Sequence, residues 1–450
     1  MQSSKNGEVA ERLAIRYRHV NAGILKRIAA RHRWSTGNES PALSALSALR
    51  CGIHPAAMPP DSPRLGAEAD RPARLVSLDV FRGLTIMGMI LVNNPGTWGA
   101  IFAPLKHAAW HGWTPTDLVF PFFLFIVGVA IPLAFTKRLA RGADRGDLVR
   151  KTVKRAAVLF AIGLGLAFYS RGWRFLAGEG IDLSDFRILG VLQRIALCYL
   201  AASLLFLTTS ARTQVVVGAG ILLGYWAALE LVPVPGIGAG HLDVAAETLP
   251  AYVDRLLLGQ HLWAGADKLW DPEGVLSTLP AIVTTLLGIV AGQWVLADRE
   301  ASAETAAKLM AVGLALFAAG SAWGWVFPVN KALWTSSYVL LTGGLAFSVL
   351  GACYWAADVR GWRGWTTPFV AYGVNALLVF VGSSLLAQTL ARIQVAGPDG
   401  PRSLQSWIYE TVFAPVGPPE VSSLLYALVW IGGWYLVLRA LHQRNIIWKV

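Results

Sequence analysis

Two histidines and one carboxylate stand immediately before a long apolar run. In PLKHAAWHGWTPTDLVFPFFLFIVG, residues 104–128, they are His107, His111 and Asp117. Titratable side chains are costly in hydrocarbon, so a cluster of them where a membrane helix begins is expected to mark a functional site. Imidazole also transfers protons readily near neutral pH. The spacing therefore predicts acid–base or nucleophilic chemistry at this point.

The composition predicts that membrane helices position this cluster. The chain has 450 residues, 55% hydrophobic and 15% charged, with a mean hydropathy of +0.50, whereas soluble domains carry about 25% charged residues. Nineteen tryptophans suit the membrane–water boundary. The net charge of +12 falls in the amino-terminal tail and in short loops without a nucleic-acid-binding motif, so no nucleic-acid partner is expected.

The cysteines and the other potential ligands give no support for a metal site. Cys51, Cys198 and Cys353 are scattered, and no His/Asp/Glu set has metal-ligand spacing. Cys198 and Cys353 lie in apolar runs and are expected to be small core residues.

The chain divides at about residue 74. Residues 1–74 are rich in Arg, Ser, Ala and Pro and hold no spanning run, so a disordered basic tail is favoured. Two alternatives stay open: a basic amphipathic helix over 9–34 on an anionic membrane surface, and a true translation start at Met58. No signal peptide is recognised. Residues 75–450 form the expected membrane domain.

Ten apolar runs in this domain approach the roughly 20 residues that a membrane helix needs. They fall at 77–95, 118–136, 155–170, 188–208, 214–232, 277–297, 308–327, 337–357, 368–390 and 422–441. The predicted fold is thus all-α, a polytopic integral membrane bundle of about ten helices. The loop 137–155 carries eight Lys and Arg residues, which predicts that it and both termini are cytoplasmic and that loop 96–117 faces outside. The absence of an outward glycosylation sequon favours a bacterial inner membrane.

Six ordered blocks in this sequence resemble the heparan-α-glucosaminide N-acetyltransferase family with its bacterial relatives. They are RLVSLDVFRGLTIMGMILVNNPGTW with PLKHAAWHGWTPTDLVFPFFLFIVG, LGVLQRIALCYL, DPEGVLSTLPAIVTTLLG, FPVNKALWTSSYVL and YGVNALLVF, within residues 74–441. The resemblance implies an enzyme that takes acetyl-CoA from the cytoplasm and acetylates a glucosamine amine on the opposite side. It also implies a homodimer, and it places the family's catalytic histidine on His107. A neutral imidazole serves either as base or as acetyl carrier, so both routes stay open.

The neighbours of His107 have competing interpretations. Asp117 suits the start of a helix, and it also suits an orienting partner for His107; the two roles are compatible. His111 falls where relatives carry asparagine, so a hydrogen-bonding or spectator role is as well supported as catalysis.

Other polar residues are assigned by their position. Arg82 pairs with Asp79 on one helical face, and its alternative role is to hold CoA phosphates. Arg194, in the LQR block, is assigned to the cofactor pathway. Asn93, Asn94, Asn330 and Lys331, with His111, are candidates for sugar binding at the outward face. Gln193 and Asn375 are predicted to bond between helices or to line a pathway. Asp271 and Glu273 are predicted to open a helix rather than to bind sugar.

Three functions remain in view. The first is acetyl transfer from acetyl-CoA to an amino sugar outside, with His107 as the chemical group and Asp117 as its support. The second is O-acetylation of a glycan or a lipid-linked sugar. The third is a non-catalytic polysaccharide transporter or export partner, against which the scarcity of midplane polar groups argues.

Overall fold

The computed structural model describes residues 75–176, 178, 180, 182–298, 300–397, 400–444 and 446–448. The predictions for the basic tail, for Cys51, for a helix over 9–34 and for a start at Met58 lie outside these residues. The described residues belong to one compact unit.

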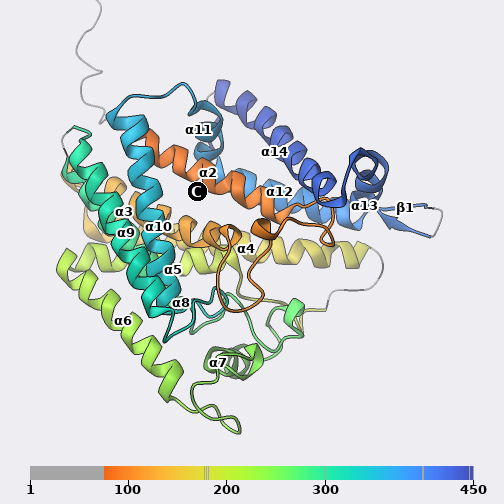
Figure 1. Ribbon diagram of the computed structural model, residues 1–450, viewed down its shortest axis with the longest axis horizontal. Helices are drawn as coiled ribbons and strands as arrows, with labels where there is room; N and C mark the ends of the chain where they lie inside the picture. The colour runs from red at the N-terminus through yellow and green to blue at the C-terminus, as the bar shows by residue number, and fades with distance from the viewer. Residues whose placement is uncertain are drawn as a thin grey trace, which may run out of the picture. The chain divides into compact units, whose positions relative to one another are not determined.

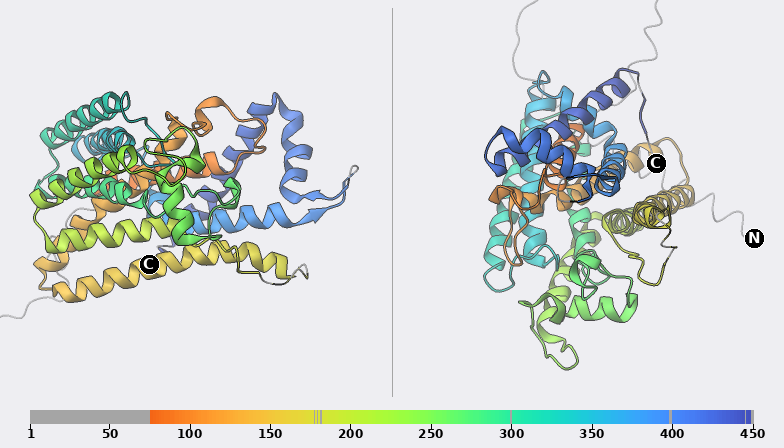
Figure 2. Two further views of the ribbon diagram at one scale, coloured as in Figure 1. Left: turned by 90° about the horizontal axis from the view of Figure 1, so that it is seen from below. Right: turned by 90° about the vertical axis from the view of Figure 1, so that its right-hand side faces the viewer.

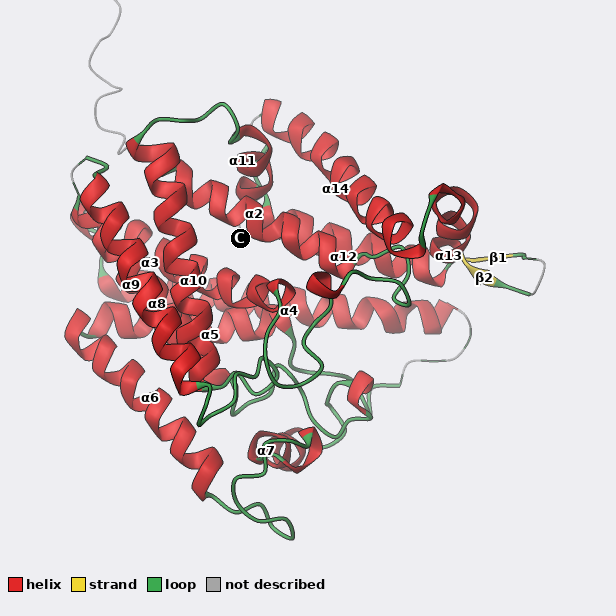
Figure 3. Cartoon of the chain, in the orientation of Figure 1, coloured by secondary structure: helices red, strands yellow, loops and turns green. Residues whose placement is uncertain are grey.

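Helices make up nearly all of the regular structure (Figure 1, Figure 3). In chain order they are α2 (Val76–Asn93), α3 (Val119–Ala140), α4 (Arg145–Leu176), α5 (Val191–Thr208), α6 (Ala211–Leu231), α7 (Leu249–Leu258), α8 (Thr278–Ala297), α9 (Ala303–Trp323), α10 (Ser336–Tyr354), α11 (Thr367–Val374), α12 (Ala376–Arg392), α13 (Leu404–Ile408) and α14 (Pro419–Gln443). Strands β1 (Gln394–Val395) and β2 (Arg402–Ser403) pair antiparallel, with Gln394 opposite Ser403. Five-residue π-helical turns follow α10 and α13.

The expected all-α membrane bundle is confirmed. In the described part of the chain, nine helices are long and apolar enough to cross a membrane. A tenth span is formed if α11 and α12 count as one, and these two are bent by 79° at Asn375. Each of the ten predicted apolar runs falls on one of these elements. Cys198 and Cys353 are free and buried, as expected for core residues.

The basic loop predicted at 137–155 is mostly helix instead. Helix α3 continues to Ala140 and α4 begins at Arg145, so the connection is only four residues long. Lys and Arg are good helix formers, and water can solvate them beyond the hydrocarbon. Hydropathy locates only the apolar part of such a helix, which explains the error. The left view of Figure 2 shows α4 as the long yellow helix that lies along α12.

Close packing of α3 against α8 holds the element that carries the site. A Cβ atom added at Gly128 would lie 2.0 Å from the Thr285 carbonyl oxygen, and one at Gly288 would lie 2.0 Å from that of Phe125. Only glycine permits this approach, as is common between membrane helices. Phe125 then packs edge-on against Phe347 of α10. The long connections gather around α7, on the side where α3 begins (Figure 3).

Candidate active site

Asp117 organises the turn that begins α3. The segment Thr114–Pro115–Thr116–Asp117 enters the short 3₁₀ turn Pro115–Leu118, in which the Asp117 N–H donates to the Thr114 carbonyl. Asp117 Oδ2 accepts the Thr114 N–H at 3.0 Å, so the carboxylate caps the turn. The same oxygen accepts the N–H of Ala108 at 3.0 Å. Asp117 therefore has the predicted helix-start geometry, and it also fixes the chain beside His107.

The second carboxylate oxygen contacts the imidazole. His107 Nδ1 lies 2.6 Å from Asp117 Oδ1. The Asp117 side chain is 1% exposed and that of His107 50% exposed. A carboxylate only accepts, so this contact requires the proton on Nδ1 and leaves a lone pair on Nε2. The orienting role predicted for Asp117 thus has the contact that it needs, and the pair can act as a base or as a nucleophile.

Lys331 completes this group from the connection between α9 and α10. Its Nζ lies 3.0 Å from His107 Nδ1, 3.3 Å from Nε2 and 3.4 Å from Asp117 Oδ1. Burial holds the pKa of the Lys331 ammonium below its usual value in spite of the Asp117 carboxylate nearby. The contact with Nε2 is long for a hydrogen bond, so the lone pair is only weakly engaged.

Asn330 shapes the turn that presents Lys331. It is fully buried, its Oδ1 accepts the Leu333 N–H at 2.9 Å, and its own N–H donates to the Thr335 hydroxyl. Tyr338, in the first turn of α10, donates to the Asp117 carbonyl at 2.6 Å and so joins the helix that follows this turn to the segment that begins α3. Asn330 is therefore placed to position Lys331.

A cavity of about 1030 Å³ begins at this group and follows α3. The residues of α3 that line the cavity recur every three or four positions from Phe120 to Arg138. They form a stripe along one face of the helix that is about 27 Å long at 1.5 Å per residue. That length is close to the hydrocarbon thickness of a bilayer. One cavity thus joins the two ends of the membrane domain, at the upper end of the usual size range of small-molecule sites.

Arginines from separate helices surround the end of the cavity away from His107, here called the arginine mouth. They are Arg82 of α2, Arg138 of α3 and Arg155 of α4. Arg82 donates to Asp79 and to the Gly373 carbonyl, both at 3.2 Å, so it is anchored while it faces the cavity. Arg155 lies over the Tyr199 ring at 5.1 Å. Trp448 lines the same end. Guanidinium groups in such an array suit phosphate.

Aromatic residues line the opposite end, here called the histidine mouth. Trp110, Trp263 and Trp270 make successive edge-to-face contacts at 5.5 and 5.7 Å. All three line the cavity with His107, Lys331 and Asn93. Indole rings supply apolar faces of the kind that pack against the carbon face of a sugar ring.

A charge cluster that the sequence did not suggest supports this mouth. Arg187 contacts Asp271 at 2.6 and 2.8 Å and Glu273 at 2.5 Å. The helix start predicted at Asp271 and Glu273 is wrong, because α8 begins at Thr278. Both carboxylates accept hydrogen bonds from the Arg187 guanidinium instead. Burial opposes the Arg187 charge, but these bonds hold its pKa above the usual value. Arg187 and Glu273 line the cavity.

Asp254 lies behind this cluster. It is almost fully buried, and it accepts the Val275 N–H at 2.8 Å. Burial raises the pKa of Asp254 to about 6.

Four predicted site residues stand outside the cavity lining: Arg194, Asn94, His111 and the buried Asn330 described above. Arg194 is 1% exposed, donates to Gly274 and Ser277, and lies over the Trp334 ring at 5.2 Å. Among the described residues its neighbours Leu192 and Ile195 line the cavity in its place. Asn94 is buried and donates to the Ile90 carbonyl. His111 contacts Asp243 at 3.0 Å and Asn330 at 3.4 Å, beside the site rather than in it.

Gln193 and Asn375, the polar residues predicted within apolar runs, both lie between packed segments of the chain. Gln193 lies against Gly163, where an added Cβ would be 2.3 Å from its Oε1, so it packs α5 on α4. Asn375 occupies the bend between α11 and α12 and bonds to Ile446 and Trp448. In the described part of the chain, no group of three or more His, Cys, Asp or Glu side chains is placed to hold a metal ion.

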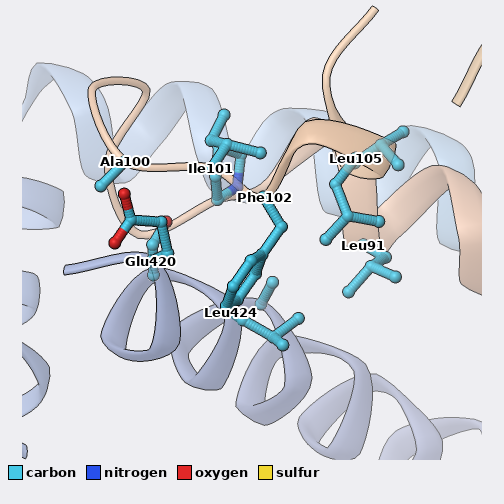
Figure 4. Close-up of a pocket in the computed structure, with 11 residues that line it drawn as sticks. Leu91, Ala100, Ile101, Phe102, Leu105, Glu420 and Leu424 are labelled. Carbon is cyan, nitrogen blue, oxygen red and sulfur yellow. The ribbon is translucent and has the colours of Figure 1, made fainter. Parts of the chain in front are cut away.

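A second hollow lies between the loop after α2 and helix α14 (Figure 4). Leu91, Ile101, Phe102 and Leu424 line it, with Glu420 at its side. Its volume of about 10 Å³ is roughly that of one water molecule. The large cavity is therefore the candidate site for substrates.

Fold and site together define an integral membrane protein with an Asp–His pair at one mouth of a cavity that crosses its helical bundle. Within that class, the chain belongs to the heparan-alpha-glucosaminide N-acetyltransferase family, whose catalytic-region model matches residues 74–326. The resemblance noted in the sequence is thus confirmed.

Two curated relatives carry the family's name. The chain is similar to the heparan-alpha-glucosaminide N-acetyltransferases of Homo sapiens, with 33% identity, and Mus musculus, with 30% identity. Each match extends over 429 residues and covers 84% of this chain and 60% of the relative. The chain therefore spans about three fifths of the length of the curated relatives that it matches.

Proposed function

We propose that the protein is a transmembrane N-acetyltransferase that moves acetyl from acetyl-CoA at the arginine mouth to the amine of a glucosamine-type sugar at the histidine mouth. The observation that carries the proposal is the single cavity joining an arginine cluster to an Asp–His pair along the length of α3. The family membership supports the reaction type.

The basic residues support the orientation. Lys137 and Arg138 end α3, and α4 opens with further Arg and Lys residues, so the positive-inside rule favours a cytoplasmic arginine mouth. Acetyl-CoA is then bound on the side where it is made. The histidine mouth opens to the outside, which in a bacterial inner membrane is the periplasm, and both termini are cytoplasmic.

The two mouths match the two substrates. Three guanidinium groups at the arginine mouth suit the phosphates of CoA, and the cavity between them and His107 has room for its extended thioester arm. At the histidine mouth, Glu273 suits a sugar ammonium and the tryptophans suit a sugar face.

His107 has the geometry for the acetyl transfer. In the direct route the amine nitrogen attacks the thioester carbonyl carbon, the new C–N bond forms and the C–S bond breaks. The proton lost by the amine passes to His107 Nε2 and then to the departing thiolate, which leaves as the CoA thiol. The Lys331 ammonium neutralises the charge that develops on the carbonyl oxygen. In the alternative route Nε2 itself carries acetyl between the substrates.

Reconstituted protein tests the proposal. Proteoliposomes supplied with acetyl-CoA on the arginine-mouth side and glucosamine on the other should release CoA thiol and form a base-stable acetamide. His107→Ala should abolish release, whereas the matched variant His111→Ala should keep most of it. Undiminished release by His107→Ala would overturn the assignment of the histidine. A base-labile product would show O-acetylation, and sugar flux without thiol release would show a transporter.

A further inference from the structure

Residues 446–448 are fastened into the bend between α11 and α12. Asn375 Nδ2 donates to the Ile446 carbonyl at 3.2 Å, and its Oδ1 accepts the Trp448 N–H at 2.9 Å. The Ile446 N–H donates to Leu441 of α14 at 2.9 Å. Asn375 is 1% exposed. The side-chain amide of Asn375 therefore uses both its nitrogen and its oxygen to bond the backbone of this segment.

The bend itself is built around that amide. Helix α11 ends at Val374 and α12 begins at Ala376. Asn375 stands between them, and its backbone is not helical. A polar side chain within an apolar span is costly unless bonded. Here both of its polar atoms bond to the segment 446–448, so the bend and the segment stabilise each other. Helices α11 and α14 both pack on α2, as Figure 1 shows, which places the segment beside Arg82.

Trp448 is held at the arginine mouth without being buried there. Its side chain lines the cavity together with Arg82, Arg138 and Arg155, yet the residue is 40% exposed. A large ring in a core would be covered, and a mobile surface ring would have no fixed backbone. An indole that is fixed by its backbone and open to a cavity between guanidinium groups is suited to stacking on a flat aromatic ligand beside phosphates.

We propose that Trp448, positioned by Asn375, stacks on the adenine ring of the donor while the three arginines hold its phosphates. The inference rests on the proposed function, which supplies the donor, and it assigns selectivity for a nucleotide-bearing thioester to this pair of residues. Trp448 is the contact residue and Asn375 the positioning residue.

Comparing two acetyl donors separates recognition of the nucleotide from effects on the thioester arm or on the chemistry. Acetyl-CoA carries the adenosine phosphates, and S-acetyl-pantetheine has the same thioester arm without them. Trp448→Ala should raise KM for acetyl-CoA roughly 5- to 150-fold, the range expected for the loss of one base–aromatic stack. Its kcat, and KM for S-acetyl-pantetheine, should stay at the wild-type values. Trp448→Phe should keep most of the affinity.

Asn375→Leu should shift KM for acetyl-CoA in the same direction and leave kcat/KM for the short donor unchanged, which also shows that the variant is folded. Trp362→Ala is the matched control, because Trp362 is an exposed indole in the connection between α10 and α11 and packs on Trp355. It should change neither KM. Equal changes for both donors in Trp448→Ala, or faster turnover of acetyl-CoA, would overturn the inference, since the segment would then shape or block the mouth.

Binding of adenosine 3′,5′-bisphosphate, measured by calorimetry without any acceptor, separates this inference from the proposed function. Binding that is lost in Trp448→Ala supports the nucleotide site even if no acetyl is transferred. Acetyl transfer from acetyl-CoA with unchanged binding in Trp448→Ala refutes the site and leaves the function standing. Neither binding nor transfer by the wild-type protein refutes both.

Discussion

Replacing Asp117 with asparagine should reverse the proton arrangement of His107. Oδ2 of Asp117 accepts two backbone N–H groups, from Ala108 and Thr114, each at 3.0 Å. An asparagine must place its carbonyl oxygen there, because its amino group would face those donors. The amino group then points at His107 Nδ1, where the carboxylate oxygen stood at 2.6 Å. Nδ1 must now accept, so the proton moves to Nε2 and the lone pair facing the reaction is lost.

The expected cost is roughly a 10³- to 10⁴-fold fall in kcat, which is the effect of forcing the wrong tautomer on a catalytic imidazole. That range corresponds to about 4–5.5 kcal/mol of activation free energy. KM for acetyl-CoA should change little, since the arginine mouth is untouched. Thiol release by the purified variant in proteoliposomes measures both constants, and thermal unfolding in detergent verifies that the variant is folded.

Asp243→Asn is the matched control for this substitution. Asp243 contacts His111 at 3.0 Å, but its side chain is 93% exposed, so the same change there meets solvent. It should leave kcat within about twofold of the wild type, as expected for an exposed pair. A folded Asp117→Asn variant with more than a tenth of wild-type kcat would refute the tautomer argument.

Four further outcomes are expected. Lys331→Met should lower kcat roughly 10²- to 10³-fold without changing KM for acetyl-CoA, as loss of one charge-stabilising donor does; an unchanged kcat would remove Lys331 from the chemistry. Arg138→Gln should raise KM for acetyl-CoA about tenfold, an effect weakened by salt, and not KM for S-acetyl-pantetheine. Burial raises the pKa of Asp254 from its ordinary value of 3.8 to about 6, so the folded state binds the proton more tightly and stability falls as pH rises through that window. Asp254→Asn should remove this pH-dependent loss of unfolding free energy, which is about 3 kcal/mol. Unfolding curves at pH 4 and pH 7 measure the difference for both proteins. Arg194→Met should lower the unfolding temperature while leaving KM for acetyl-CoA unchanged, and a raised KM would restore its predicted cofactor role.

The sequence predicts the spans well because membrane insertion depends on a local property, the hydropathy of about 20 consecutive residues. It predicts the Asp117–His107 pair for a similar reason, since only ten positions separate the two residues. The extension of α4 from Arg145 is missed because charged turns outside the hydrocarbon carry no hydropathy signal.

Contacts between distant segments were predicted less well. Lys331 reaches His107 across 224 positions, and only the family block FPVNK pointed to it. Arg187 pairs with Asp271 across 84 positions. Each of these residues is an ordinary loop residue in isolation, and no local pattern distinguishes the carboxylate that opens a helix from the one that neutralises a distant arginine.

Arg194 shows the limit within a single helix. The cavity-lining residues of α5 are Val191, Leu192, Ile195 and Tyr199, and at about 100° per residue they form one stripe. Arg194 lies about 115° from the centre of that stripe, so it points into the protein, where it contacts Gly274, Ser277 and the Trp334 ring. A polar side chain in an apolar run indicates only that the side chain must be bonded to some other group. Helix rotation decides whether the partner is a ligand or the protein, and that rotation is set by packing between helices, which the sequence of one helix does not contain.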